Sequence, residues 1–167
     1  GPCYGGRRGN TGDTLSTVSG GFVLNDKEHV IKVLAVTQTA VTEVNFGFSN
    51  EKAELKLYSG ANIKDGSMAT LYPECFDSIF QFVGEVDQGT TCKFETLDDF
   101  TSQNNINYID FLKIDVEGHE LAVIRGARKL LSEHRPFVLC EYNPRTAMAA
   151  GWNALDLREE IEAAMGP

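Results

Sequence analysis

The chain has 167 residues, of which 42% are hydrophobic, enough for one globular domain with a buried core and too few for two full domains. Its formal net charge of -9 argues against a nucleic-acid-binding surface and against attraction to anionic membranes, because both depend on clustered basic residues. We therefore expect one domain over residues 1–167, with neither nucleic acid nor membrane among its partners.

The sequence also carries few signs of export or of a cysteine-based site. No apolar run approaches the roughly 18 residues that a spanning helix needs, and the opening GPCYGGRRGNTGD lacks the apolar core of a secretory signal. The cysteines form no CxxC pair, which argues against a zinc site or a redox motif, and Cys140 lies in an apolar run where a reduced thiol is expected. These features predict a soluble, cytoplasmic chain.

The first third of the chain has weak structural signals. Residues 1–20 are rich in Gly, Ser and Thr without a hydrophobic period, which predicts loop or poorly ordered chain. The apolar residues of 29–36 fit either a short helix or a strand, and we favour a helix for the first part.

Strand patterns are clearer in the middle of the chain. Residues 42–48 (TEVNFGF) and 54–58 (ELKLY) alternate apolar and polar side chains, and SNEKA supplies turn residues between them, so we expect these two strands to pair. Residues 61–81 are long and irregular, which is typical of a functional or mobile loop. Residues 90–97 predict another strand, followed by a short helix in LDDFTSQNN with acidic residues in its first turn.

The last third alternates strands and helices. Residues 111–116 and 137–143 read as strands covered on both faces, and Pro136 ends the helix predicted over about 119–132. A further helix is predicted over residues 152–165. This alternation is typical of a doubly wound α/β layer.

Three acidic residues fall at the carboxyl ends of the two buried strands, where ligands bind in such sheets. Asp115 and Glu117 finish the first strand, and Glu141 finishes the second. Ionised carboxylates are costly to bury unpaired, so these residues need internal partners or a ligand. The alternative to a ligand site is an ion pair with Lys113 or Arg145, together with capping of the next helix by Glu117.

Two further features have a functional and a structural interpretation. His119 opens the predicted helix, where it would act as a general base toward a hydroxyl or be a solvated first-turn residue. RRGNTGDT, residues 7–14, is the nearest segment to a glycine-rich cofactor loop, but it does not follow a predicted strand, and a flexible terminus explains it equally simply. No HExxH, P-loop or GxSxG motif is present.

TLDDF, IDFLKIDVEGHELAVIRGARKLL and RPFVLCEYN together resemble the FkbM-type family of S-adenosylmethionine-dependent methyltransferases. The upstream VNFGFSNEKAELKLY resembles that family's strand and turn before its central loop, so the similarity covers about residues 44–143. The resemblance implies a Rossmann-like, three-layer α/β sandwich with a mostly parallel sheet. In that fold the cofactor lies over the carboxyl ends of the first strands.

The resemblance also implies roles for individual residues. Asp115 and Glu117 match the acidic pair of KIDVEG, and Glu141 matches the acid that ends the following strand. Together with His119, which is proposed from its own chemistry as a base and not from the resemblance, they form the expected catalytic set. The expected cofactor-binding residues are Gly9, Asn10, Gly12, Asp13 and Asp26. The acidic residue that begins the family's cofactor loop is replaced by GRR, and no final antiparallel strand pair follows the last helix, so we expect a domain truncated at both ends.

These observations predict a methyltransferase that moves a methyl group from S-adenosylmethionine to a hydroxyl of a sugar or small molecule. No metal is required, although carboxylate oxygens would suit a hard cation such as magnesium. The alternative is a non-catalytic relic or binding module that has lost the cofactor loop. A nicotinamide-dependent enzyme is disfavoured because no GxGxxG follows a strand. An exposed sheet edge at the truncated end would favour a homo-oligomer.

Overall fold

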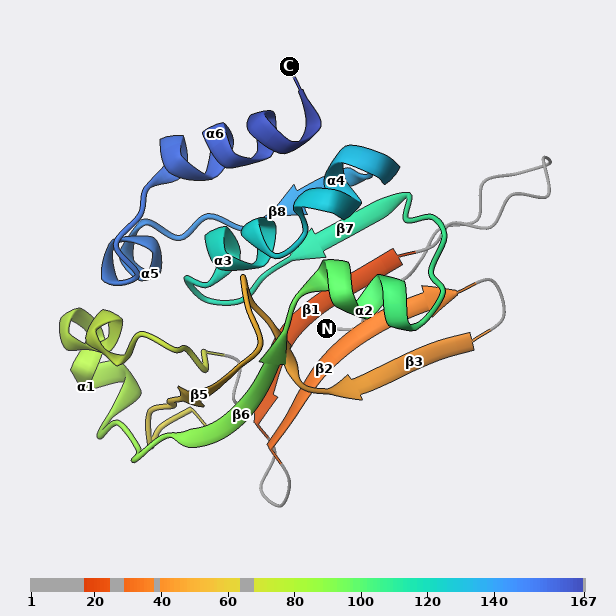
Figure 1. The fold of residues 1–167 in the computed structure, drawn as a ribbon. Coiled ribbons are helices and arrows are strands. Elements are labelled where there is room, and N and C mark those ends of the chain that lie inside the picture. Colours follow the sequence, from red (N-terminus) through yellow and green to blue (C-terminus); the bar gives the residue numbers. More distant parts are fainter. Residues whose placement is uncertain (1–16, 25–28, 38–39, 64–67, 167) are drawn as a thin grey trace, which may run out of the picture.

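The computed structural model describes residues 17–24, 29–37, 40–63 and 68–166. The elements are β1 (Thr17–Leu24), β2 (His29–Thr37), β3 (Ala40–Asn45), β4 (Gly47–Phe48), β5 (Ala53–Leu57), η1 (Pro73–Ile79), α1 (Phe80–Val83), β6 (Thr90–Glu95), α2 (Leu97–Gln103), β7 (Phe111–Ile114), α3 (Glu120–Arg125), α4 (Arg128–His134), β8 (Phe137–Cys140), α5 (Pro144–Ala149) and α6 (Ala154–Met165). Figure 1 shows the strands of the larger sheet side by side, with α3, α4 and α6 grouped near β7 and β8.

The larger sheet has the order β3-β2-β1-β7-β8 and is mixed. Strands β1, β7 and β8 run parallel, whereas β2 is antiparallel to both β1 and β3. The chain is therefore a mixed α/β protein, and the expected mostly parallel sheet is not what the described residues form. The reason lies in the connections: only residues 25–28 and 38–39 separate β1, β2 and β3, too few for the crossover that a parallel neighbour requires.

Two predictions near the start of the chain are wrong. Residues 29–36, for which we favoured a helix, form strand β2, and residues 17–20, expected as loop, belong to strand β1. The hydrophobic period of this segment fits either a helix or a strand. β-Branched residues dominate HVIKVLAVT and favour an extended backbone, which explains why the segment forms a strand. The prediction for residues 1–16 lies outside the described residues.

The smaller sheet has the order β4-β6-β5, with β6 parallel to β4 and antiparallel to β5. The strand predicted over residues 54–58 exists as β5, but the one predicted over 42–48 is divided: its first residues belong to β3 of the larger sheet, and Gly47–Phe48 form β4 of the smaller one. The expected direct pairing of the two is also wrong, because β6 lies between β4 and β5. A Cβ added to Gly47 would lie 2.3 Å from a ring atom of Phe94, so the absence of a side chain at this position admits the Phe94 ring.

The helix predicted over residues 119–132 is interrupted between α3 and α4. A Cβ on Gly126 would lie 2.0 Å from the carbonyl oxygen of Ser49, so glycine permits the close approach of these two backbones. Helix α4 then begins against α2: the Asp98 carboxylate accepts hydrogen bonds from the backbone N–H groups of Lys129 (3.0 Å) and Leu130 (2.8 Å). The interruption and the new helix start both depend on residues distant in sequence.

The main hydrophobic core includes side chains from strand β7 and from helices α3 and α4, and Leu112 and Ile114 of β7 are fully buried. Strand β8 is the edge of the larger sheet and has two different faces. Val138 packs against the core, but Phe137 and Leu139 are 77% and 52% exposed, so the prediction that β8 is covered on both faces is wrong. The expected self-association at an open edge stays a prediction.

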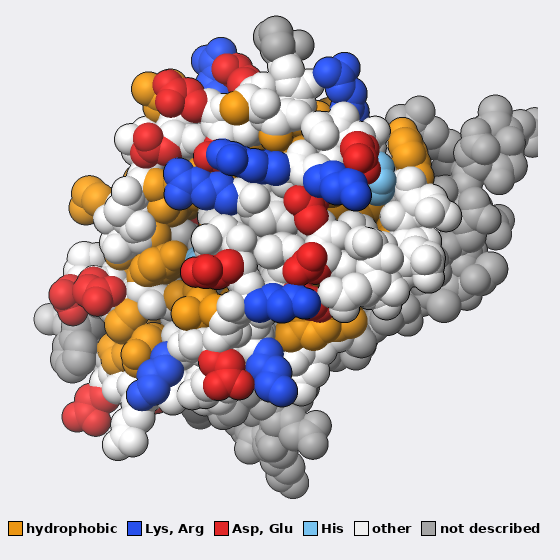
Figure 2. Space-filling view, viewed as in Figure 1, with side chains coloured by type: hydrophobic (Ala, Val, Ile, Leu, Met, Phe, Trp, Pro, Cys, Tyr) orange, Lys and Arg blue, Asp and Glu red, His pale blue; other side chains and the backbone are white. Residues whose placement is uncertain are grey.

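The chain continues through α5 to α6, which begins at Ala154 rather than at 152. Asn153 starts this helix with a capping box, in which its side chain accepts from the backbone of Asp156 and the Asp156 carboxylate accepts from the backbone of Asn153. None of the helices in the described part of the chain is long and apolar enough to cross a membrane. In Figure 2, basic and acidic side chains are interspersed over the described part of one face.

Candidate functional site

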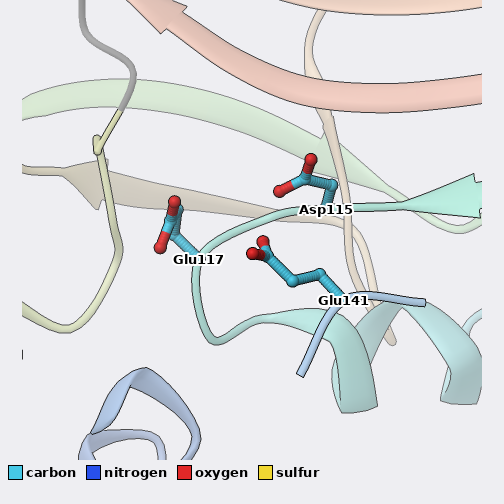
Figure 3. Close-up of side chains that lie close together, drawn as sticks. All are labelled: Asp115, Glu117 and Glu141. Atoms are coloured by element: carbon cyan, nitrogen blue, oxygen red, sulfur yellow. The ribbon is translucent and has the colours of Figure 1, made fainter. Parts of the chain in front are cut away.

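The carboxyl groups of Asp115, Glu117 and Glu141 gather at the ends of β7 and β8, where Figure 3 shows the three side chains close together. One oxygen from each lies within 4.8 Å of the others. The parallel register explains the grouping: Ile114 lies opposite Cys140, so the residues that follow emerge side by side. We call these three residues the acidic cluster. Such carboxylates are the ligand type that a hard cation prefers.

A tight turn between β7 and α3 orients the first two members of the cluster. Glu117 has φ 49° and Gly118 has φ 103°, both in the left-handed region, which is strained for a glutamate and natural for glycine. The Glu120 side chain, only 2% exposed, folds back and accepts hydrogen bonds from the backbone N–H groups of Val116 and Gly118, each at 3.1 Å. The turn is therefore stabilised by the buried carboxyl group of the residue that follows it.

Two residues from distant segments hold the same turn by its carbonyl groups. Thr70 Oγ1 donates to the carbonyl oxygen of Glu117 at 2.7 Å. Trp152 Nε1 donates to the carbonyl oxygen of Gly118 at 2.8 Å, within a buried environment. The left-handed conformation of Glu117 thus persists because surrounding groups satisfy the polar atoms of the turn on several sides.

The members of the acidic cluster differ in their ionisation. Burial tends to raise the pKa of Asp115, but the hydrogen bond with Glu141 and the ammonium of Lys113, 2.6 Å away, hold that pKa below its ordinary value. The hydrogen bond with Asp115, followed by burial and the neighbouring carboxylates, raises the pKa of Glu141 to about 7. Burial and the charge of Asp115 also raise the pKa of Glu117. Asp115 therefore keeps the negative charge, while Glu141 exchanges a proton near neutral pH.

Lys113 forms the ion pair that the sequence offered as one alternative, and it does so with Asp115. The other part of that alternative was capping of the next helix by Glu117. In the structure it is instead the Glu120 side chain that folds back and accepts hydrogen bonds from the backbone N–H groups of the turn. Lys113 Nζ lies 2.6 Å from Asp115 Oδ2, so this ion pair offsets one negative charge of the cluster.

His119 lies directly after the turn and is 6% exposed, so the interpretation as a solvated first-turn residue is wrong. Its Nδ1 lies 2.8 Å from the Tyr72 hydroxyl, and its Nε2 lies 3.0 Å from Ser49 Oγ. Burial lowers the pKa of His119 to about 4, which makes the imidazole neutral at pH 7. The expected role of His119 as a general base stays a prediction.

The expected cofactor-binding residues, namely Gly9, Asn10, Gly12, Asp13 and Asp26, all lie outside the described residues. Conversely, the turn depends on side chains to which the sequence assigned no role. Glu120 lies at the start of the predicted helix, where the sequence does not distinguish a solvated side chain from one that folds back on the turn. Thr70 and Trp152 carried no local signal, since only the folded chain brings them to the turn.

Comparison with protein families gives one match. The family model described as the methyltransferase FkbM domain matches residues 15–164, which include both sheets and the acidic cluster. Comparison with curated proteins and with solved structures found no match.

Proposed function

The chain belongs to the family of methyltransferase FkbM domains, and from this premise we propose that it transfers the methyl group of S-adenosylmethionine to a hydroxyl oxygen of a sugar or other small molecule. The proposal assumes the Rossmann-like arrangement of such enzymes, with the reaction at the carboxyl ends of β1, β7 and β8. The observation that carries it is the acidic cluster, in which one carboxyl group has a pKa of about 7 beside another that stays ionised.

Glu141 is the proposed general base. A base is most effective when its pKa lies near the operating pH, because it is then both largely unprotonated and basic enough to accept a proton. Glu141 would accept the hydroxyl proton when the hydroxyl oxygen takes the methyl group that bound S-adenosylmethionine would supply. Asp115 keeps its charge through Lys113 and so maintains the raised pKa of Glu141. Glu117 is proposed to orient the hydroxyl by accepting its hydrogen bond.

The negative charge of the acidic cluster suits the positive charge of the proposed cofactor. When bound, S-adenosylmethionine supplies an electrophilic methyl group on a positively charged sulfur. The acidic cluster places three carboxyl groups at the strand ends, and Lys113 forms an ion pair with one of them, so the negative charge of the cluster favours a cation over a phosphate-bearing cofactor. Gly9, Asn10, Gly12, Asp13 and Asp26 remain the proposed residues for the rest of the cofactor.

The test is methyl transfer itself. The full chain is incubated with S-adenosylmethionine labelled in the methyl group and a panel of methyl glycosides and simple alcohols, and labelled ether products are counted. We expect transfer, and a loss of about a hundredfold or more in kcat for Glu141→Gln, typical of removing a general base. Glu133→Gln, an exposed position on α4, is the matched control and should leave kcat unchanged.

A binding measurement before the assay distinguishes the enzyme from a non-catalytic relic or binding module. The measurement is titration calorimetry with S-adenosylmethionine and with its demethylated product. Binding that weakens on Asp13→Ala, together with transfer, supports the enzyme. Absence of binding heat and of product across the panel would leave the non-catalytic module as the better account.

A further inference from the structure

A pocket of about 350 Å³ lies beside the turn that carries the acidic cluster, in a part of the chain to which no role has been given. It opens between the segment that joins β4 to β5, strand β5 itself, and the residues that lead into η1. This volume is at the lower end of the range of small-ligand pockets. His119 is part of its wall and lies two residues after Glu117, so the pocket and the acidic cluster share the turn between β7 and α3.

The walls of the pocket combine aromatic and aliphatic surface. Tyr58 and Tyr72 contribute rings, and Leu55 and Leu71 contribute branched aliphatic side chains, all of them partly exposed. Partly exposed rings of this kind offer an apolar face on which the C–H side of a saturated ring can lie, while the phenolic oxygen keeps a polar contact. The pocket is therefore suited to a ring with one apolar side.

A directed chain of hydrogen bonds runs behind this wall. Ser49 Oγ donates to Asn50 Oδ1 at 3.2 Å, so its oxygen is left to accept from His119 Nε2. The neutral imidazole then accepts at Nδ1 from the Tyr72 hydroxyl, at 2.8 Å. Burial, and then the charge of Glu120, raises the pKa of Tyr72 to about 12, so its proton is retained at neutral pH.

The direction of the chain determines what the pocket offers to a ligand. Because the proton of Tyr72 points to His119, the remaining lone pairs of its oxygen are acceptors. At the other end, Asn50 uses its oxygen for Ser49, and no described residue accepts a hydrogen bond from its Nδ2, which remains a donor. One acceptor and one donor are thus held in place before a ligand binds, which lowers the entropic cost of binding.

The charged groups of the pocket favour a neutral ligand. Glu51 and Lys56 contribute one negative and one positive formal charge to its lining, and Lys56 Nζ donates a hydrogen bond to the carbonyl oxygen of Gln88 at 3.3 Å. Neither a phosphate group nor a cation gains from such a pair, whereas a hydroxyl accepts from the ammonium and donates to the carboxylate. A ligand with several hydroxyls satisfies both groups at once.

We propose that this pocket binds a neutral polyhydroxylated ring, that is, a saccharide unit of the methyl acceptor. Tyr72 and Asn50 hold its hydroxyls and Tyr58 covers its apolar side. The identification of the bound ring as the acceptor rests on the proposed function, but its binding in the pocket does not, since no step of methyl transfer is involved.

Binding is measured by saturation-transfer NMR on the full chain without S-adenosylmethionine. The probes are methyl α-glucoside, methyl α-galactoside and, as a planar ring of different chemistry, adenosine. We expect saturable glycoside binding that weakens about threefold to tenfold in Tyr72→Phe and in Asn50→Ala, the effect of losing one hydrogen bond. The matched controls Tyr108→Phe and Asn107→Ala lie on the exposed connection before β7 and should bind as the parent does.

Three results overturn the inference: no glycoside binds, the glycosides bind equally to the parent and to both pocket variants, or adenosine alone shows Tyr72-dependent binding, in which case the pocket belongs to a purine. Methyl transfer is assayed separately on the same variants. Pocket-dependent binding without transfer would refute the proposed function and leave the saccharide site standing. Transfer with a KM that is insensitive to both variants would refute the identification of the bound ring as the methyl acceptor and leave the function standing.

Discussion

Trp152 Nε1 donates a 2.8 Å hydrogen bond to the carbonyl oxygen of Gly118, a residue 34 positions earlier in the chain. The indole thereby connects the segment between α5 and α6 to the turn that presents Glu117. The next strand end, with Glu141, precedes α5, so one C-terminal segment provides both a member of the acidic cluster and a support for the turn opposite it. The geometry of the cluster consequently depends on the packing of the last third of the chain.

Loss of this contact should destabilise the fold. In Trp152→Phe the buried carbonyl of Gly118 loses its donor, and we expect the free energy of unfolding to fall by about 1–3 kcal/mol. Urea denaturation followed by circular dichroism measures this change. An unchanged denaturation midpoint would show that water replaces the indole at no cost.

The turn itself should tolerate no side chain at its glycine. Gly118→Ala places a Cβ 2.8 Å from the carbonyl oxygen of Thr146 at φ 103°, so both a clash and backbone strain oppose folding. Gly151→Ala is the matched control, because its φ of 80° carries the strain but nothing lies within 4 Å of the added Cβ. We expect Gly118→Ala to lower the urea midpoint clearly more than Gly151→Ala does, and equal losses would remove the clash from the explanation.

The raised pKa of Glu141 should appear in the pH dependence of methyl transfer. Glu141 is active when deprotonated, so kcat should rise with pH through about 7. In Asp115→Asn the largest cause of the raised pKa of Glu141 is removed, and the rising limb should move to lower pH, with turnover reduced more than the free energy of unfolding. A pH–rate profile with the same rising limb in Asp115→Asn as in the parent would exclude this coupling. Asp99→Asn, at an exposed side chain outside the acidic cluster, is the control and should leave the profile unchanged.

The buried His119 should make stability sensitive to acid. Its pKa is about 4 in the folded chain and near 6.5 when unfolded, so the unfolded state takes up a proton first as the pH falls. Its contribution is complete above about pH 6.5 and is lost progressively down to about pH 4, amounting to about 3 kcal/mol. Urea denaturation at several pH values should show this loss in the parent and in His134→Gln. The loss should be reduced in His119→Gln, and a loss of equal size in that variant would assign the acid sensitivity to other groups.

Helix α4 should depend on a cap from another helix. Removing the carboxylate in Asp98→Ala leaves the backbone N–H groups of Lys129 and Leu130 without their acceptor, and we expect a loss of about 1–2 kcal/mol in unfolding free energy. Asp99→Ala breaks only an exposed ion pair with Lys52 and should cost within about 0.5 kcal/mol. Comparable losses in both variants would contradict the capping role.

Where a local signal was strong, the sequence predicted the element correctly. The alternation in 54–58 and 90–97 marks strands β5 and β6, and the acidic first turn after Thr96 marks helix α2, whose Thr96 side chain accepts from the Asp99 backbone. These features depend on residues two to four positions apart, which sequence patterns record directly. The same patterns did not show that β6 separates β4 from β5, because pairing depends on contacts across the chain.

The sequence by itself determined that acidic residues finish two adjacent strands and that a glycine follows them, since strand periodicity and the glycine break can be read locally. It also determined the family, through the KIDVEGHE segment and its surroundings. Only the tertiary structure decided that Asp115 lies beside Glu141 and raises its pKa, that Lys113 pairs with Asp115, and that His119 is buried against Tyr72 and Ser49. Such pKa shifts and burial depend on distances of a few ångströms between segments up to 70 residues apart, and only folding sets those distances.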